Sequence, residues 1–351
     1  MIFPQIDTPA VLIDLDTAET NISRFQSHCD ANGLRVRPHI KTHKLPQLAR
    51  MQVETGAIGI TCQKITEAEA MIAEGGIDDV LLTYNVVGPA KLARLRALAQ
   101  RVRLSVVCDS HAVAEGLSDA FREAPDPLIV LVECDTGAGR CGVQTPEAAA
   151  ALAQVVAAMP GLHFGGLMTY PPVDAEESVQ HWLSRAVTLC EDAGLVVPVV
   201  SNGGSPGMWQ ASKVAATTEY RIGTYVYNDR SLQARGVCDW SDCALTVLAT
   251  VVSVPTAERA IVDAGSKVLT SDLLGMTGHG HVLGRPDIAI SALSEEHGTL
   301  NAPRINLQVG DRVRIVPNHA CVVSNMLDHV EIVRGSIHEG QAQVTARGQV
   351  W

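Results

Sequence analysis

The stretch Leu34-Arg35-Val36-Arg37-Pro38-His39-Ile40-Lys41 decides the fold, because it is the first of a series of short strand-like segments. Stretches with helical periodicity, such as Ile65–Glu74 and Glu176–Ala193, separate several of these segments. Alternating strands and helices predict a parallel α/β sheet, and eight units predict a (β/α)8 TIM-like barrel. A doubly wound open sheet is the alternative, and the number of units disfavours it. The seven further segments are Gly59–Cys62, Val80–Thr83, Leu104–Val107, Leu128–Val132, Phe164–Met168, Pro198–Val200 and Tyr220–Ile222.

The pattern changes after about Trp240, where strand-like segments follow one another with few helical stretches between them. This texture predicts an antiparallel β domain. We therefore expect a barrel over residues 1–240 and a β domain over residues 241–351, with residues 1–16 pairing with the C-terminal sheet. The strand-like segments of the second half are Val247–Val254, Arg259–Asp263, Ile288–Leu293, Arg312–Val316, His329–Val333 and Gln341–Ala346.

The composition and net charge of the chain disfavour several classes of function. The 351 residues are 46% hydrophobic, enough for a large core, and a net charge of −11 disfavours a nucleic-acid partner. No apolar run reaches the length of a membrane span, and the first cationic side chain is Arg24, so we expect neither a membrane partner nor a signal peptide. The 9 cysteines lack the spacing of a disulfide framework, which favours reduced thiols in the cytoplasm.

Lys41 is a candidate nucleophile. If the strand reaches Lys41, side-chain alternation places its amine on one face with His39 and Arg37. Neighbouring cations disfavour the ammonium form, and a neutral amine attacks carbonyl groups, as a lysine must to form a Schiff base with pyridoxal phosphate. An ordinary basic strand with solvated side chains explains the same residues, and the two interpretations stay open on local chemistry.

Other candidates follow the strands, because barrels carry functional groups at the C-terminal ends of their strands. The clusters of glycine with Ser or Thr suit a phosphate, whose oxygens can approach bare backbone N–H groups. A tight turn explains each glycine cluster taken singly. The residues at these ends are Gln63 after the second strand, Arg140 in the turn Asp135–Gly142 after the fifth, Tyr170 after the sixth, Gly203-Gly204-Ser205 after the seventh, and Arg221, Gly223 and Thr224 at the eighth.

The octapeptide Arg37-Pro38-His39-Ile40-Lys41-Thr42-His43-Lys44 resembles the lysine motif of fold-type III pyridoxal-phosphate enzymes. These are relatives of alanine racemase, and the chain is most similar to their D-threonine aldolase and D-serine dehydratase family over nearly its whole length. The resemblance implies that Lys41 carries the cofactor and Arg140 contacts its phenolic oxygen. It also places Arg221 at the pyridine nitrogen, the amides of Gly223 and Thr224 on the phosphate, and Tyr170 beside the ring. We expect Gln63, Gly203, Gly204 and Ser205 to complete the cofactor site.

His319 and Cys321 form the candidate metal site. If they lie on a strand, residues two apart share a face, and imidazole with thiolate suits zinc or a similar divalent ion. A structural His-x-Cys pair is the alternative. The resemblance implies a divalent metal, Zn, Mn or Mg, held by these two residues near the cofactor.

The leading hypothesis is a lyase that cleaves a D-3-hydroxy amino acid, a small-molecule substrate, to glycine and an aldehyde by retro-aldol chemistry. A dehydratase releasing ammonia from D-serine or D-3-hydroxyaspartate is the alternative, followed by a racemase and a non-catalytic cofactor carrier. Family members often have Gly and His or Asn after the tyrosine, where this chain has Pro171-Pro172, so the role of the missing residue is not carried over. The resemblance further implies a homodimer.

Overall fold

The computed structural model describes residues 2–351, which form two compact units. The barrel unit consists of Arg24–Lys41, Pro46–Gly223 and Gln349–Trp351. The β unit consists of the described residues up to Ser23, of Thr42–Leu45 and of Thr224–Gly348. The boundary at residue 240 stays a prediction. No helix among the described residues combines the length and apolar character needed to cross a membrane.

The barrel unit contains a parallel sheet with the strand order β2-β9-β8-β7-β6-β5-β4-β3. A parallel bridge between His39 and Thr61, just beyond β2 and at β3, joins the two ends of this order. The predicted TIM-like barrel is thereby confirmed. Its strands are β2 (Arg35–Pro38), β3 (Ile60–Cys62), β4 (Asp79–Asn85), β5 (Arg103–Cys108), β6 (Leu128–Cys134), β7 (Leu162–Thr169), β8 (Val199–Asn202) and β9 (Glu219–Ile222).

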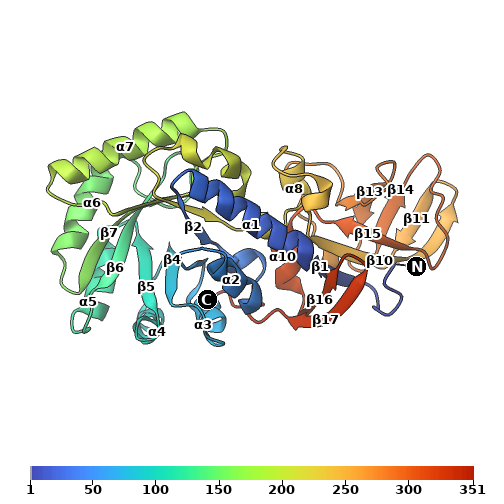
Figure 1. Ribbon diagram of the computed structural model, residues 1–351, viewed down its shortest axis with the longest axis horizontal. Helices are drawn as coiled ribbons and strands as arrows, with labels where there is room; N and C mark the ends of the chain where they lie inside the picture. Colours follow the sequence, from blue (N-terminus) through green and yellow to red (C-terminus); the bar gives the residue numbers. More distant parts are fainter. Residues whose placement is uncertain (1) are drawn as a thin grey trace. The chain divides into compact units, whose positions relative to one another are not determined.

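Helices connect these strands, because consecutive parallel strands require a crossover (Figure 1). In α7 the buried residues Val179, Leu183, Ala186 and Cys190 recur every three or four positions, so one face packs inward. The barrel helices are α2 (Pro46–Glu54), α3 (Ile65–Ile72), α4 (Pro89–Ala99), α5 (His111–Phe121), α6 (Pro146–Ala158), α7 (Glu176–Asp192) and the 3-10 helix η2 (Ser205–Lys213), and α1 (Leu15–Ala31) runs from the β unit into the barrel unit.

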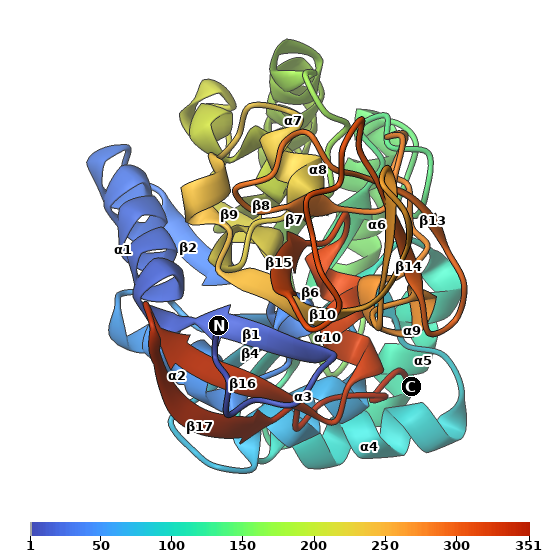
Figure 2. The same ribbon diagram turned by 90° about the vertical axis from the view of Figure 1, so that its right-hand side faces the viewer.

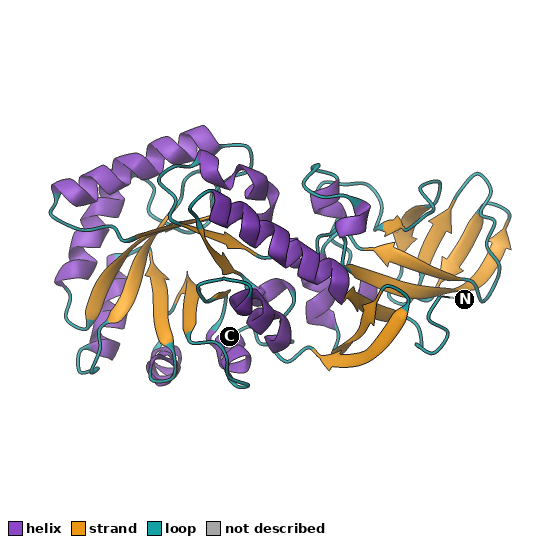
Figure 3. Cartoon of the chain, viewed as in Figure 1, coloured by secondary structure: helices purple, strands orange, loops and turns teal. Residues whose placement is uncertain are grey.

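The β unit is built mainly of strands, in contrast to the alternating helices and strands of the barrel unit (Figure 3). The strand β1 (Ala10–Asp14) pairs antiparallel with β10 and parallel with β16, while the other strand pairs of this sheet are antiparallel (Figure 2). The predicted antiparallel character is therefore confirmed. The remaining strands are β10 (Leu245–Thr256), β11 (Arg259–Val262), β12 (His281–Val282), β13 (Ala289–Leu293), β14 (Gly298–Asn301), β15 (Arg312–Val316), β16 (His329–Arg334) and β17 (Ile337–Gln343), and the helices are α8 (Arg230–Gln233), α9 (Ser266–Leu269) and α10 (Ala320–Met326).

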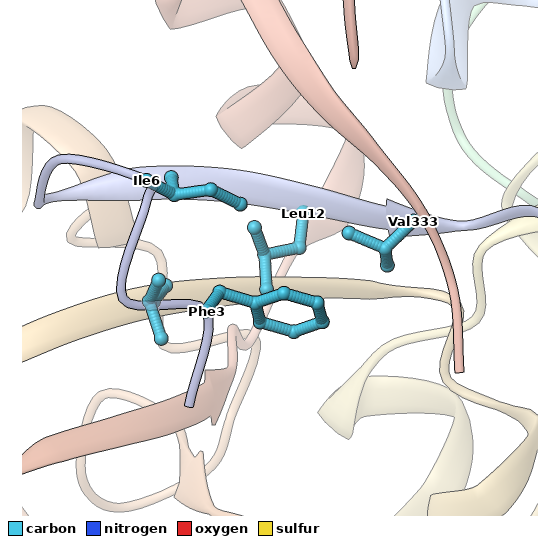
Figure 4. Packing of buried hydrophobic residues seen from close by; sticks show 5 residues of the cluster. Phe3, Ile6, Leu12 and Val333 are labelled. Carbon is cyan, nitrogen blue, oxygen red and sulfur yellow. The ribbon is translucent and has the colours of Figure 1, made fainter. Parts of the chain in front are cut away.

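A hydrophobic cluster joins the N-terminal segment to this sheet. Phe3 and Ile6 pack with Leu12 of β1, Leu248 of β10 and Val333 of β16, all of them buried (Figure 4). Burying one such side chain contributes roughly 1.5–3 kcal/mol. Phe3 and Ile6 therefore belong to the core of the β unit.

Two local predictions differ from the structure. The strand β2 ends at Pro38, and Lys41 lies in the 3-10 turn η1 (Ile40–Thr42), where its amide donates to Nδ1 of His39 at 3.3 Å. His319 and Cys321 lie at the start of α10, not on a strand. The buried carboxylate of Asp229 accepts from the amide of Ala320 at 3.0 Å and so satisfies a donor of the first helical turn.

Candidate active site

Lys41 is exposed, directly after β2. Two residues before it, His39 Nε2 lies 3.3 Å from Oε1 of Gln63, and Nε2 of Gln63 donates to the carbonyl of Thr83 at 2.9 Å. Gln63 is thus held at the end of β3, beside the segment that leads to Lys41. The structure brings these two predicted cofactor residues to neighbouring strand ends.

Arg37 serves the barrel rather than the site. Its Nε donates to Oε2 of Glu219 at 2.9 Å, and its Nη1 donates to Oδ1 of Asp79 at 2.5 Å. Arg37 and Glu219 are both buried. The guanidinium that the sequence places beside Lys41 is therefore neutralised by two carboxylates of the barrel wall.

The turn after β6 positions Arg140. The carboxylate of Asp135 accepts from the amides of Gly137 and Gly139 at 2.9 and 3.1 Å. Gly142 has φ +120°, and a Cβ there would lie 2.4 Å from the amide nitrogen of Asp135, so only glycine fits. The Arg140 guanidinium lies over the ring of Tyr170 at 5.0 Å from its centroid. Arg140 and Tyr170, from separate strand ends, are thus in contact.

Arg221 is buried at the end of β9. Its Nη1 donates to the carbonyl and to the hydroxyl of Ser201, each at 2.9 Å, and its Nη2 donates to the carbonyl of Thr169 at 2.7 Å. Burial lowers the pKa of this guanidinium to about 10, against the opposing effect of Glu219 and Glu133. It therefore remains a cationic donor at neutral pH, oriented by β7 and β8.

The predicted phosphate loops follow adjacent strands, β8 and β9. Gly203 has φ +133°, and a Cβ there would lie 2.4 Å from the carbonyl oxygen of Arg221. At Gly204 a Cβ would lie 3.3 Å from the Tyr170 ring, and its carbonyl accepts from the Tyr220 hydroxyl at 3.0 Å. The 3-10 helix η2 begins at Ser205. Close packing thus explains why both positions are glycine. The backbone at the start of η2 also lies beside the Tyr170 ring.

These residues fit the cofactor that the sequence resemblance implies. Two guanidinium groups, an aromatic ring and two glycine turns at short helix starts suit an anionic aromatic ligand carrying a phosphate. Glu133, the second-to-last residue of β6, also leaves its buried Oε2 without a hydrogen-bond partner among the described residues. A buried carboxylate oxygen without a partner at a strand end calls for an explanation, and a bound ligand is one.

His319 and Cys321 come together in the β unit. The two side chains are hydrogen-bonded to each other, and His319 Nδ1 lies 2.7 Å from Oδ2 of Asp272. Cys321 Sγ also lies 3.1 Å from the Thr42 hydroxyl and 3.5 Å from the Thr224 hydroxyl. The predicted pair is therefore in contact although α10 replaces the expected strand, because His319 has extended backbone angles at the helix start.

The electrostatics of this pair favour a cation. The hydrogen bond to Cys321 is the main cause that raises the pKa of His319 to about 9, and Asp272 adds to it while burial opposes it. A place that stabilises a proton on imidazole between a thiol and a carboxylate also suits a metal ion. In the described residues, however, no group of three or more His, Cys, Asp or Glu side chains is arranged around one metal position. The residues present fit a two-ligand site completed by other molecules.

Four residues of this region escaped the sequence analysis: Thr42, Glu133, Asp229 and Asp272. Thr42 belongs to the octapeptide, so its position directly after Lys41 could have marked it as a candidate site residue. Asp272 and Asp229 lie 47 and 91 residues from the positions they contact, and neither stands in a recognisable motif. Only the folded chain reveals their partners.

Comparisons with known proteins show the family of the chain. Residues 13–231 match the alanine racemase N-terminal domain, and residues 244–333 match a putative serine dehydratase domain. The chain is 33% identical to the D-threonine aldolase of Arthrobacter sp, covering 98% of this chain and 93% of that protein. It is 35% identical to the D-threo-3-hydroxyaspartate dehydratase of Delftia sp., covering 90% and 91% of the two chains.

Solved structures show the same relationship. The D-threonine aldolase of Filomicrobium marinum superimposes with a TM-score of 0.90 at 33% identity, covering 99% of this chain and 98% of that chain. Two variants of the D-threo-3-hydroxyaspartate dehydratase, each 31% identical, superimpose with TM-scores of 0.90 and 0.87 and cover at least 97% of each chain. One carries a histidine-to-alanine exchange, and the other, in a metal-free form, carries a cysteine-to-alanine exchange two positions later.

The barrel fold and the family match define an alanine racemase-like enzyme, and membership in this class implies pyridoxal phosphate as the cofactor. Within it, the chain belongs to the family of lyases that includes D-threonine aldolase and the 3-hydroxyaspartate aldolases and dehydratases.

Proposed function

We propose that the protein is a pyridoxal-phosphate- and divalent-metal-dependent aldolase that cleaves D-3-hydroxy amino acids to glycine and an aldehyde. The observation that carries this proposal is the contact between Cys321 and the hydroxyl of Thr42. Thr42 directly follows Lys41, so the chain itself ties the candidate metal pair to the candidate cofactor lysine. A divalent metal bound by His319 and Cys321 would suit a substrate with a 3-hydroxyl group.

The barrel unit supplies the cofactor residues. When bound, pyridoxal phosphate withdraws electrons from the substrate carbon that loses a bond. The amine of Lys41 is proposed to hold it covalently, and Arg140 and Arg221 to bind its phenolic oxygen and ring nitrogen. The phosphate would lie on the backbone of Gly203-Gly204-Ser205 and Gly223-Thr224, with Tyr170 beside the ring and Gln63 at the neighbouring strand end. Arg221 keeps its own proton at neutral pH because its pKa stays near 10, so it donates to the ring nitrogen.

The β unit supplies the metal residues. When bound, the ion acts as a Lewis acid toward the substrate hydroxyl. Asp272 at Nδ1 of His319 orients the ring and leaves Nε2 available as a ligand. The hydroxyls of Thr42 and Thr224 contact Cys321 Sγ and can donate to its thiolate. Because thiolate and imidazole are softer ligands than carboxylates, Zn is favoured over Mn and Mg.

A dehydratase is the second candidate, and one observation favours it. The dehydratase variants described above exchange a histidine and a cysteine two positions apart, the residue types and spacing of His319 and Cys321. In that reaction the substrate loses its Cα proton and its hydroxyl and yields ammonia and a keto acid. The residues proposed for cofactor and metal serve both reactions.

The assembly and the compartment are also proposed. Related enzymes of this class imply a homodimer, which light scattering of the purified protein would reveal as twice the 37.3 kDa chain mass. The structure shows no disulfide bond among the cysteines of the described residues, and most of these cysteines are buried, which supports the proposal of a reducing cytoplasm.

Product analysis tests the proposal. The enzyme is incubated with D-threonine, D-serine or D-3-hydroxyaspartate, with and without a metal chelator, and glycine, aldehyde, keto acid and ammonia are measured. Metal-dependent formation of glycine and aldehyde from D-threonine is the expected result. Ammonia and keto acid as main products would establish the dehydratase, and no turnover of any of these D substrates would contradict both candidates.

A further inference from the structure

We infer that Glu133 is a positioning residue whose buried carboxylate holds the Arg140 guanidinium at the Tyr170 ring, where the cofactor is proposed to bind. Glu133 is the second-to-last residue of β6, and Arg140 lies in the loop that follows. Oε1 of Glu133 lies 4.0 Å from Nη2 of Arg140. This inference rests on the proposed cofactor site, and it assigns a role that the sequence motifs do not suggest.

Among the described residues, Glu133 lacks the complete hydrogen bonding of a structural ion pair. Its side chain is 3% exposed, yet its buried Oε2 has no hydrogen-bond partner among the described residues. Glu219, in the same barrel, shows the contrast, because one oxygen accepts from Arg37 and the other from Ser201. A buried carboxylate with an unsatisfied oxygen costs folding free energy, so its presence at a strand end points to a role in the site.

The net effect of burial and neighbouring groups on the pKa also differs between Glu133 and Glu219. Burial raises the pKa of Glu133, with Arg140 and Arg221 opposing the effect and Asp109 and Asp135 adding to it. At Glu219 burial also favours protonation, but Arg37 and the hydrogen bond from Ser201 lower its pKa overall. Both arginines of the proposed cofactor site thus favour the charged form of Glu133, but burial outweighs them, and the net effect is a raised pKa.

Arg140 needs such a partner. Its side chain is 54% exposed, and a long exposed side chain samples many rotamers. Asp135 fixes the backbone of the loop through the amides of Gly137 and Gly139, but it does not hold the guanidinium. Among the described residues, Glu133 and the Tyr170 ring contact the guanidinium itself. Removal of the carboxylate leaves the ring contact.

The test measures pyridoxal phosphate binding to cofactor-free protein by fluorescence titration. Glu133→Gln keeps the size of the side chain and removes its charge, and we expect about tenfold weaker binding, the effect of losing one charged contact. Glu133→Asp keeps the charge and is expected to recover part of the affinity. Glu147→Gln, at an exposed carboxylate of α6, is the matched control and should bind like the wild type.

A double-mutant cycle separates positioning from a general structural effect. If Glu133 acts through Arg140, Glu133→Gln changes affinity less than twofold when introduced into Arg140→Gln. Equal losses in both backgrounds, or wild-type affinity of Glu133→Gln, overturn this inference while leaving the proposed function standing. Failure of the wild type to bind pyridoxal phosphate overturns the proposed function and this inference together. Thermal unfolding of each variant shows that the affinities refer to folded protein.

Discussion

The hydroxyl of Thr42 lies 3.1 Å from the thiol of Cys321, which follows it by 279 residues. Thr42 begins the four-residue segment of the β unit that interrupts the barrel unit, between Lys41 and Pro46. The next two residues are anchored in the same unit, since His43 Nδ1 accepts from the amide of Leu45 and Lys44 Nζ donates to the carbonyl of Ala346. The octapeptide thus combines a barrel strand, the candidate cofactor lysine and a contact with Cys321.

Replacement of the proposed cofactor lysine should abolish covalent cofactor attachment. Lys41→Ala is expected to lose the visible absorption band of the purified protein, because the variant lacks the amine proposed to form the Schiff base. Lys213→Ala removes an exposed amine at the end of η2 and should retain the band. Borohydride reduction followed by peptide mapping provides the check, and cofactor covalently fixed in Lys41→Ala would refute the assignment.

Removal of the carboxylate that orients His319 should weaken metal binding. Asp272→Asn keeps the size of the side chain but replaces an acceptor of the imidazole N–H with an amide. We expect roughly 10-fold to 100-fold lower metal affinity, as for other partners of metal ligands. Competition with a coloured chelator measures it, and Asp192→Asn on the exposed end of α7 is the control. Equal affinities of the two variants would show that Asp272 does not support a metal ligand.

The buried pair of Arg37 and Glu219 should contribute strongly to the stability of the barrel. Glu219→Gln leaves Arg37 with Asp79 as its remaining carboxylate, and breaking a buried pair costs roughly 3 kcal/mol in the free energy of unfolding. Urea denaturation measures the change. Glu74→Gln, which breaks the more exposed pair with Arg50, should cost no more than about 1 kcal/mol. A smaller loss for Glu219→Gln than for this control would contradict the expectation.

The same pair should make stability depend on pH. Burial favours a protonated Glu219, but Arg37 and Ser201 lower its pKa overall. The folded pKa is therefore below the unfolded value of about 4.3, so this stabilisation is present above pH 4.3 and is lost as the pH falls through the folded pKa. Urea denaturation between pH 6 and 3 should show a steeper acid loss for the wild type than for Glu219→Gln. Parallel profiles would exclude Glu219 as a source of acid sensitivity.

Thiol reactivity should divide the cysteines by burial. Cys141 is exposed, whereas Cys29 and Cys108 are buried, and burial is the main cause that raises the pKa of each of these two thiols to about 12. A thiol reagent at pH 8 should modify Cys141 rapidly and the buried cysteines only after unfolding. Mass spectrometry of the modified peptides locates the label. Rapid native labelling of Cys29 would contradict the packing described for the barrel.

The fate of the Cα hydrogen should distinguish the two candidate reactions. Retro-aldol cleavage breaks the Cα–Cβ bond and leaves the Cα–H bond intact, whereas dehydration breaks Cα–H. With D-threonine deuterated at Cα, we expect glycine that retains the label, measured by mass spectrometry of early products. Keto acid and ammonia with loss of the label would assign the dehydratase, and exchange without net product would indicate racemisation.

Much of the fold was predictable because backbone hydrogen bonding imposes regular patterns. Short apolar strands alternating with helical stretches permit few arrangements other than a parallel barrel, and the segments Leu128–Val132 and Phe164–Met168 became β6 and β7 with small extensions. Segment ends were less certain. The predicted strand Gln341–Ala346 overlaps β17 only in part, because its register is set by pairing with β16.

The candidate site residues were also predictable from local motifs. A lysine, an arginine in a glycine turn or a His-x-Cys pair can be recognised from a few neighbouring positions in the sequence. Whether these residues perform the proposed roles stays a prediction. The sequence alone therefore determined the class of fold and the chemical types available to the site.

Tertiary structure decided which groups meet. The carboxylate of Asp229 accepts from the amide of Ala320 at the start of α10, a helix that stands where a strand was expected. Asp272 contacts His319, and Thr42 contacts Cys321, each from a distant segment of the chain. In the sequence Glu133 is one more residue of a buried strand, whereas in the fold its Oε1 lies 4.0 Å from Nη2 of Arg140 and its Oε2 has no hydrogen-bond partner among the described residues. Such contacts depend on which side chains the closed barrel and the sheet bring within a few ångströms, and no local pattern encodes that distance.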